Sequence, residues 1–200
     1  MFFNNSFILA STSKSREKIL KQSKLNFSKA KPVCDEDKLK KKLIKNKTTI
    51  KNISLELARL KSLSISVKKK NIFVVGSDTT ISLNNSLLSK AKNTKEAKKK
   101  LIKMSGKTHD IYSSASVYYN GKEVWKSTQK TTVKIRKLTK KELDLYISKA
   151  GNNILKSVGC YQIEKLGPRV IEYIRGDFFN VMGFPLFPFL KFLKKSNIKK

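Results

Sequence analysis

Asp78 is the residue whose place in the sequence points most directly to chemistry. It lies just after the apolar run of residues 72–75, Ile-Phe-Val-Val, which has the composition of a buried strand. A carboxylate placed there is partly withdrawn from water, and it binds Mg²⁺ or accepts a proton from a water molecule. The alternative is a turn residue that caps the following segment. Asp78 is therefore a candidate catalytic and metal-binding residue.

Ser11 and Arg16 form a second candidate group. Ser11 follows the apolar segment Phe7–Ala10, and Arg16 lies in the first turn of the helix that we expect after residues 11–13. Backbone N–H groups at a helix N-terminus, a hydroxyl and a guanidinium together bind anions, and the phosphates of a nucleotide would suit them. The alternative is that residues 11–13 are ordinary helix caps.

Three more charged residues complete the set of candidates. Glu36 lies in the acidic island of residues 34–37, where it is either a second metal or water ligand or a solvated loop acid. Lys61 in a predicted amphipathic helix and Lys90 after a short apolar segment would offset the charge of phosphates. In a chain with 40 lysines, residue type alone singles out neither.

Strands and helices must alternate to bring these residues together. The patterns predict an α/β fold with a mixed central sheet flanked by helices, and they predict the lysine-rich stretch after Asp37 as a loop. The hairpin signal Asn120-Gly121 and the capping box of Thr139 and Glu142 are the strongest local signals. We expect strands at 7–10, 27–33, 72–75, 109–119, 123–135 and 170–174, and helices at 16–22, 52–66, 93–105, from 139 and after 185.

The composition is typical of a chain that folds without disulfide bonds or a structural metal. The 200 residues are 39% hydrophobic and 30% charged, and they show no linker long enough to divide the chain, so we expect one domain over residues 1–200. Cys34 and Cys160 are too far apart in sequence to indicate a disulfide framework or a zinc site, which favours a reducing compartment. The lone histidine, His109, has no neighbouring Cys or His, which favours a buried polar role over a metal ligand.

The net charge of +31 suggests a nucleic acid or an anionic membrane as partner at first sight. The basic residues are 40 Lys and only 5 Arg, they are dispersed along the chain, and no aromatic residues interleave them as in single-strand binders. This pattern favours a solvated surface and no specific nucleic-acid partner. A basic nucleic-acid-associated protein without turnover stays open as the alternative function.

Neither end of the sequence predicts secretion or a membrane anchor. No basic segment precedes the apolar residues among the first ten, as a signal peptide would require. Residues 178–193 are very apolar, but Gly183, Pro185 and Lys191 interrupt them, and they fall short of the ~20 residues that span a bilayer. We therefore expect a cytoplasmic protein with no membrane partner.

Taken in order along the chain, these motifs resemble those of the Maf family. No single block is decisive, but their joint order over nearly the whole sequence is specific. The blocks are Ile8-Leu9-Ala10-Ser11-Thr12-Ser13 with Arg16, Leu57-Ala58 with Lys61, Gly76-Ser77-Asp78-Thr79, Lys90, Ser105-Gly106 with His109, Gly159-Cys160-Tyr161-Gln162-Ile163-Glu164, and Gly176-Asp177 with Gly183-Phe184-Pro185.

The resemblance implies a single Maf-like domain over residues 1–200, built as two lobes with a cleft between them. It also implies a nucleoside triphosphate pyrophosphatase that releases a nucleoside monophosphate and pyrophosphate with a divalent cation, Mg²⁺ or Mn²⁺. A house-cleaning role against non-standard nucleotides, a cytoplasmic location and an association with septum formation belong to the same resemblance. A homodimer is compatible with it and with the apolar C-terminal stretch.

The resemblance also implies roles for the candidate residues. Asp78 would be the proton acceptor or a metal-linked acid with Glu36 beside it, and Lys61 and Lys90 would bind phosphate. Ser11 and Arg16 would lie in the phosphate loop.

Some positions depart from the family pattern or divide its branches. Ser15 stands where the family commonly has an arginine or an aromatic residue, and that position is tied to base choice. Ala91 stands where the family commonly has a proline. Thr79 is similar to the branch that acts on pyrimidine nucleotides, whereas Glu164 is similar to the branch that acts on 7-methyl-GTP. Residues 157–162 resemble a third, less specified branch. The resemblance therefore places Thr79 and Glu164 among the substrate-binding residues and implies the reaction more firmly than the base.

Overall fold

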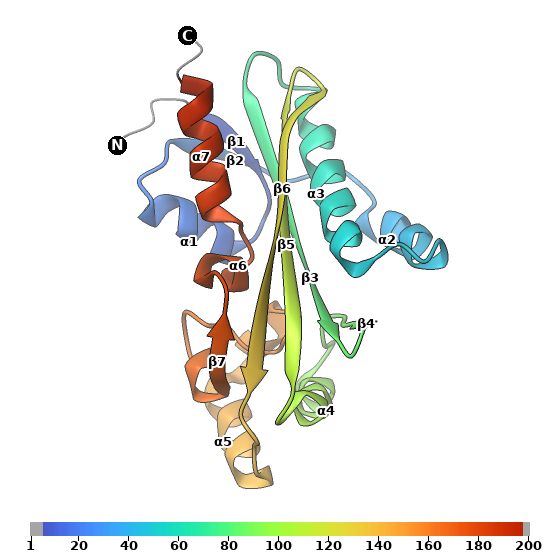
Figure 1. Ribbon diagram of the computed structural model, residues 1–200, viewed down its shortest axis with the longest axis vertical. Coiled ribbons are helices and arrows are strands. Elements are labelled where there is room, and N and C mark those ends of the chain that lie inside the picture. Colours follow the sequence, from blue (N-terminus) through green and yellow to red (C-terminus); the bar gives the residue numbers. More distant parts are fainter. Residues whose placement is uncertain (1–5, 198–200) are drawn as a thin grey trace. The chain divides into compact units, whose positions relative to one another are not determined.

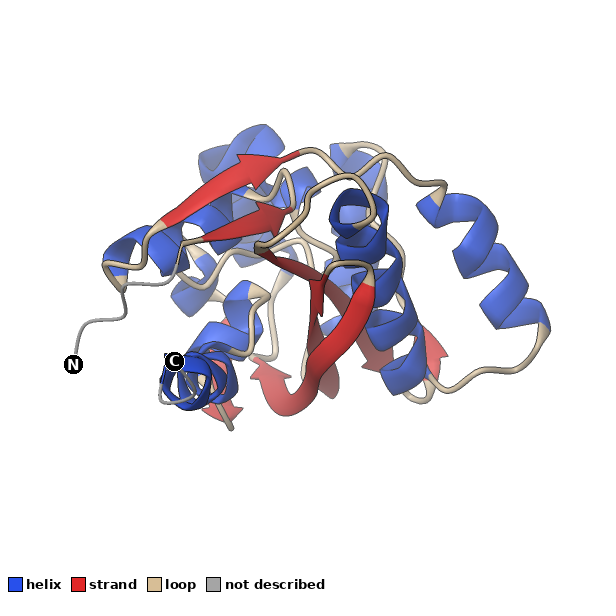
Figure 2. Ribbon diagram, turned by 90° about the horizontal axis from the view of Figure 1, so that it is seen from above, coloured by secondary structure: helices blue, strands red, loops and turns tan. Residues whose placement is uncertain are grey.

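The computed structural model describes residues 6–197 (Figure 1). Helices and strands intermix along the chain, and Figure 2 distinguishes them by colour. The fold divides into two compact units. The first holds the residues up to Thr79, Tyr112–Gln129 and the chain from Gly183 on, and the second holds Thr80–Ile111 and Lys130–Met182. Residues 1–5, on which part of the expectation about secretion rests, lie outside the described residues.

The strands form one mixed seven-stranded sheet in the order β2-β1-β3-β5-β6-β7, with β4 paired to β3. β1 is parallel to β2 and β3, whereas β7 is antiparallel to β6. The predicted α/β class with a mixed sheet is confirmed. The strands are β1 (Phe7–Ala10), β2 (Phe27–Ala30), β3 (Phe73–Leu83), β4 (Ser86–Leu87), β5 (Thr108–Tyr119), β6 (Lys122–Ile135) and β7 (Ile171–Arg175).

Capping side chains begin several helices where the sequence predicts them. The Ser13 and Asn93 side chains accept the backbone N–H three residues on, and Thr139 and Glu142 form the predicted capping box. In residues 6–197 no helix is long and apolar enough to span a bilayer. The helices are α1 (Lys14–Gln22), α2 (Glu36–Lys45), α3 (Ile50–Ser66), α4 (Thr94–Met104), α5 (Lys140–Ala150), α6 (Phe178–Met182) and α7 (Leu186–Asn197), with 3₁₀ turns at Gly151–Lys156 and Gly167–Arg169.

Three structural details differ from the sequence predictions. The lysine-rich stretch after Asp37 is helix α2 and not a loop, because the Asp35 side chain accepts the N–H of Lys38 at 2.8 Å and the acidic first turn and basic last turn match the helix dipole. Strand β3 continues to Leu83 instead of ending at residue 75, and β2 ends at Ala30. The polar residues after residue 75 therefore lie within a strand.

The core of the first unit forms around its parallel strands. Phe7 of β1 stacks edge-on against Phe189 of α7, and Phe184 and Trp125 contact the same ring. The pairing of Ala10 with Gly76 brings Ser11 and the residues after Gly76 to the same end of β1. Since ligands of such sheets bind beyond the carboxyl ends of strands, this edge is the expected place for a site.

Gly76 lets helix α3 pack directly on β3. A Cβ at this position would lie only 2.4 Å from the carbonyl oxygen of Ala58 and 2.5 Å from Ser62 Oγ. The Gly76 N–H instead donates to Ser62 Oγ at 2.7 Å. Because Lys61 precedes Ser62 on α3, this close approach fixes where the Lys61 side chain meets β3.

The second unit has its own core. Helices α4 and α5 and the 3₁₀ turn at Gly151–Lys156 pack together, and Leu101, Leu143 and Ile154 are buried there. His109 is buried in this unit with Nε2 2.6 Å from Tyr161 Oη. Burial lowers the pKa of His109 to about 4, so its imidazole is neutral at pH 7.

Candidate active site

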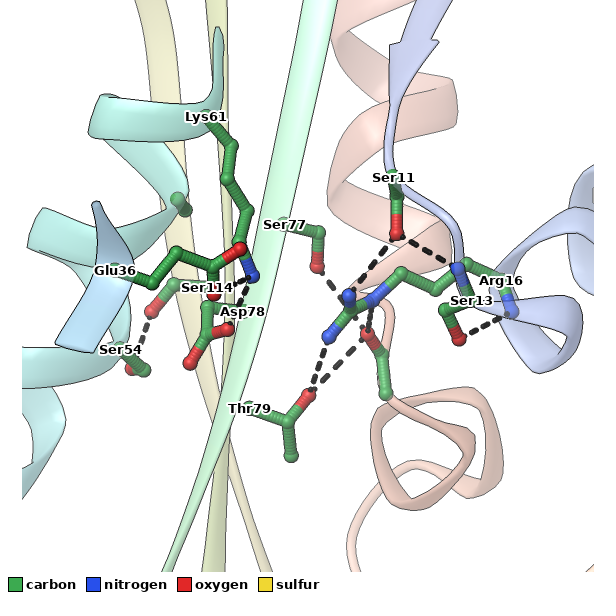
Figure 3. A network of polar contacts seen from close by, with 12 residues as sticks. Ser11, Ser13, Arg16, Glu36, Ser54, Lys61, Ser77, Asp78, Thr79 and Ser114 are labelled. Atoms are coloured by element: carbon green, nitrogen blue, oxygen red, sulfur yellow. Dashed lines mark hydrogen bonds and ion pairs between the residues drawn. The ribbon is translucent and has the colours of Figure 1, made fainter. Parts of the chain in front are cut away.

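The carboxylates of Asp78 and Glu36 meet at one ammonium group, that of Lys61. Lys61 Nζ lies 2.6 Å from Asp78 Oδ1 and 2.9 Å from Glu36 Oε2 (Figure 3). The two acids come from stretches 42 residues apart in the sequence and from different elements, α2 and β3. The three candidate residues that the sequence singled out for acid–base, metal and phosphate chemistry thus form one cluster.

Burial differs sharply among the three side chains. Lys61 is 8% exposed and Asp78 15%, whereas Glu36 is 45% exposed. A buried ammonium requires compensation by nearby negative charge, and Asp78 supplies it at the shorter distance. Glu36 lines an open depression of about 790 Å³ together with the other residues of 33–37.

A second polar cluster surrounds the guanidinium of Arg16. Its Nε donates to the carbonyl oxygen of Gly183 at 2.8 Å, Nη1 donates to Ser11 Oγ at 3.2 Å, and Nη2 donates to Thr79 Oγ1 at 3.2 Å. Three of the five guanidinium N–H groups are therefore bonded to protein acceptors. Burial lowers the pKa of Arg16, and the negative charges of Asp78 and Glu36 oppose that shift.

The two clusters lie on opposite sides of β3, as Figure 3 shows. Successive side chains of a strand point to opposite faces, so Asp78 faces Lys61 while Ser77 and Thr79 face Arg16. Ser77 Oγ and Thr79 Oγ1 both donate to the Gly183 carbonyl, at 3.2 Å and 3.3 Å. These two hydrogen bonds fix the β3 residues on both sides of Asp78 from the face of the strand opposite Lys61.

The backbone conformation that presents this carbonyl favours glycine at position 183. Its φ of +105° lies in the region that side-chain-bearing residues rarely adopt, and a Cβ would lie 3.1 Å from Thr79 Oγ1. Sequence reasoning did not single out Gly183 or Ser77 as site residues. The alternation of side chains along β3 would have found Ser77 if the strand had been predicted to its full length.

The remaining predicted residues fall elsewhere. Lys90 and Glu164 belong to the second unit, where Lys90 is exposed and Glu164 half-buried. Their roles toward a nucleotide stay predictions. Ser11, Arg16 and Thr79 form the second cluster, with most of the polar groups of Arg16 turned toward protein.

Comparison with known proteins places the chain in a family. The profile described as Maf-like protein matches residues 6–196. The chain belongs to the Maf family. The resemblance found in the motifs is thereby confirmed, and it spans almost the whole chain.

Curated Maf relatives cover the same length. The chain is 34% identical over 186 residues, 93% of each protein, to "Nucleoside triphosphate pyrophosphatase" of Caulobacter vibrioides. It is 34% identical over 194 residues, 97% of each, to "7-methyl-GTP pyrophosphatase" of Bartonella quintana, and 36% identical over 187 residues, 94% of this chain and 96% of the relative, to "Nucleoside triphosphate pyrophosphatase" of Pelagibacter ubique. Among solved structures, a HAM1 protein from Coxiella burnetii has a TM-score of 0.43 and 11% identity, covering 67% of this chain and 74% of its own, a likeness too distant to inform the site.

The donor set suits a hard divalent cation in the company of a polyphosphate. Both carboxylates approach the same nitrogen, at 2.6 Å and 2.9 Å, so the two acids lie side by side at this point. Mg²⁺ in phosphoryl-transfer sites is bound by one or two carboxylates together with substrate phosphates and water. Within residues 6–197 no group of three or more His, Cys, Asp and Glu is arranged so that it could hold a metal ion by itself. Asp78 and Glu36 are the residues that would hold the metal.

Proposed function

We propose that this chain is a nucleoside triphosphate pyrophosphatase that uses Mg²⁺ or Mn²⁺ and acts on nucleoside triphosphates, including non-standard ones. Membership of the Maf family and the printed names of its full-length relatives support the activity. The observation that carries the proposal is the meeting of Asp78, Glu36 and Lys61 at one point. Two acids and a cation are the parts that polyphosphate hydrolysis requires.

The proposed pyrophosphatase activity is hydrolysis between the α- and β-phosphates, and the residues of the site have the following roles in it. Asp78 accepts a proton from water, whose oxygen bonds to the α-phosphorus. The bond from the α-phosphorus to the bridging oxygen breaks, and pyrophosphate leaves with the bonding electrons. Lys61 binds a phosphate oxygen and offsets the negative charge that develops on it. A bound divalent cation adds Lewis-acid stabilisation of the phosphate oxygens.

The Arg16 cluster supports this chemistry from the other side of β3. The bonds of Ser77 and Thr79 to Gly183 hold the backbone around Asp78. Three of the five guanidinium N–H groups of Arg16 bond to protein acceptors. The other two can bind a phosphate together with Ser11, as the resemblance implies. Lys90 and Glu164 are proposed to contact the phosphates and the base.

A substrate panel tests the proposal. The protein is incubated with natural and modified nucleoside triphosphates, 7-methyl-GTP and pyrimidine nucleotides among them, with Mg²⁺ or Mn²⁺, and pyrophosphate and orthophosphate are measured separately. The proposal expects pyrophosphate with at least one substrate, and its loss in Asp78→Asn. Release of orthophosphate alone, or tight salt-sensitive DNA binding without turnover, contradicts it.

Base preference, location and assembly belong to the same proposal. Because the relatives carry both kinds of name, Glu164→Gln and Thr79→Gln in the panel test which residue selects the base. A change in the ranking of 7-methyl-GTP against pyrimidine substrates assigns the role. We further propose a cytoplasmic location and a homodimer. Light scattering on the purified protein tests the homodimer.

A further inference from the structure

The ammonium of Lys61 lies between the two acids that would hold a divalent cation. It contacts Asp78 at 2.6 Å and Glu36 at 2.9 Å, and the side chain is 8% exposed. Strongly hydrated ions of like charge cannot share one position between the same two oxygens. The protein's own cation and a metal ion therefore compete for these carboxylates.

The chain by itself offers a metal little else at this point. Two carboxylates supply only part of the six oxygen ligands that Mg²⁺ requires, and in the part of the chain that the structure describes no group of three or more His, Cys, Asp and Glu could hold a metal ion. A triphosphate would supply the missing oxygens. It would also offer Lys61 a new partner, because phosphate oxygens bind ammonium groups well.

We propose that Lys61 is a placeholder for the metal. It pairs with Asp78 and Glu36 until a divalent cation arrives together with the triphosphate. Its side chain then moves, and the ammonium group pairs with a phosphate oxygen instead. The flexible four-carbon stem of lysine permits the movement, which a rigid arginine fork would not. The exchange leaves neither the acids nor the ammonium unpaired. This inference rests on the proposed function and adds an order to it: the metal does not bind first.

Removing the placeholder must uncover the metal site. In Lys61→Met the side chain keeps its length and apolar stem, but the ammonium that contacts both carboxylates is gone. Mn²⁺ then binds without competition and relieves their repulsion. We expect the dissociation constant for Mn²⁺ without nucleotide to fall at least ~10-fold relative to the unmodified chain.

Electron paramagnetic resonance of free Mn²⁺ measures this directly, with no nucleotide present. Lys68→Met is the matched control, because it removes the same charge from an exposed residue and should leave the affinity unchanged. In Lys61→Met/Asp78→Asn the gain in affinity should disappear. Mn²⁺ should also raise the Tm of Lys61→Met more than that of the unmodified chain. If Lys61→Met does not fold, Lys61→Gln carries the same comparison.

Equal Mn²⁺ affinity in the unmodified chain and the Lys61 variant overturns the placeholder role, even if pyrophosphate is released normally. Equal gains in the Lys61 and Lys68 variants overturn it too, since bulk charge then explains both. A gain confined to Lys61→Met in a protein that hydrolyses no nucleoside triphosphate supports the placeholder and refutes the proposed function. The two failures are therefore distinguishable.

Discussion

Replacing Gly76 by alanine should separate the geometry of the site from the stability of the fold. The added Cβ would lie 2.4 Å from the Ala58 carbonyl oxygen, a backbone atom that cannot rotate away. Restoring an ordinary contact requires helix α3 to withdraw from β3 by about 1 Å. The same shift weakens the bond from the Gly76 N–H to Ser62 Oγ and moves Lys61 away from Asp78.

The magnitudes follow from these contacts. Overpacking costs about 1–3 kcal/mol and a weakened hydrogen bond about 1 kcal/mol, while alanine regains about 0.5–1 kcal/mol of chain entropy. The net loss of about 1–3 kcal/mol lowers the Tm by roughly 3–10 °C in a chain of this size. A misplacement of about 1 Å in a reacting group lowers kcat/KM about 10²-fold.

Gly151→Ala is the control for this experiment. Gly151 has φ +53° and ψ −146° with nothing within 4 Å of an added Cβ, so alanine there costs about 1–2 kcal/mol of backbone strain without moving α3. Thermal unfolding and pyrophosphate release are measured for both variants. We expect similar losses of stability, but a loss of turnover only in Gly76→Ala. Normal turnover in Gly76→Ala, or equal losses of turnover in both variants, refutes the argument that this close approach positions Lys61.

Three other outcomes follow from the same structure. Asp78→Asn should lower kcat about 10²–10⁴-fold in a folded protein, because a proton acceptor is lost, and turnover near the unmodified level contradicts that role. Lys61→Ala and Lys90→Ala should cripple pyrophosphate release while Lys68→Ala should not; equal losses in all three would assign the effect to bulk charge. The folded-state pKa of His109, about 4, lies below its unfolded value of 6.5, so the stability it contributes is present above pH 6.5 and is lost as the pH falls toward 4. Denaturant unfolding should therefore show about 2 kcal/mol lost between pH 7 and pH 5 that His109→Asn does not show, and identical pH dependence in the two proteins would contradict it.

Local patterns predicted the elements with strong periodicity or capping. Helix α3 begins two residues before its predicted start, and the hairpin of β5 and β6 and the capping box of α5 occur where the sequence placed them. Apolar spacing and short-range hydrogen bonds determine these features, and both are visible within a few residues.

Helix α2 and the second part of strand β3 escaped prediction because their residues are mostly charged or polar. In α2 the many lysines look like a solvated loop, although lysine and leucine favour helices and Asp35 caps this one. In β3 the run of Ser and Thr after Gly76 looks like the end of a strand, yet Ser77 and Thr80 are buried within it. Hydroxyls of buried strand residues are satisfied by partners far along the chain, which local patterns do not reveal.

The candidate site shows the same division. Residue types predicted Asp78, Glu36 and Lys61 as separate candidates, and only the pairing of distant elements brings them to one point. Gly183 lies 167 residues from Arg16 in the sequence, and it binds Arg16 through its backbone carbonyl, which every residue type has. Long-range contacts of backbone groups are the part of the site that residue types cannot predict.

Hydrolysis in ¹⁸O-labelled water tests the central claim most directly. If Asp78 activates water beside a triphosphate held by Lys61 and the metal, the label must enter the nucleoside monophosphate, and mass spectrometry should find one ¹⁸O there and none in pyrophosphate. Asp78→Asn should abolish this incorporation. Label in pyrophosphate or in orthophosphate would mean that water attacks a different phosphorus, and the assignment of these residues would be wrong.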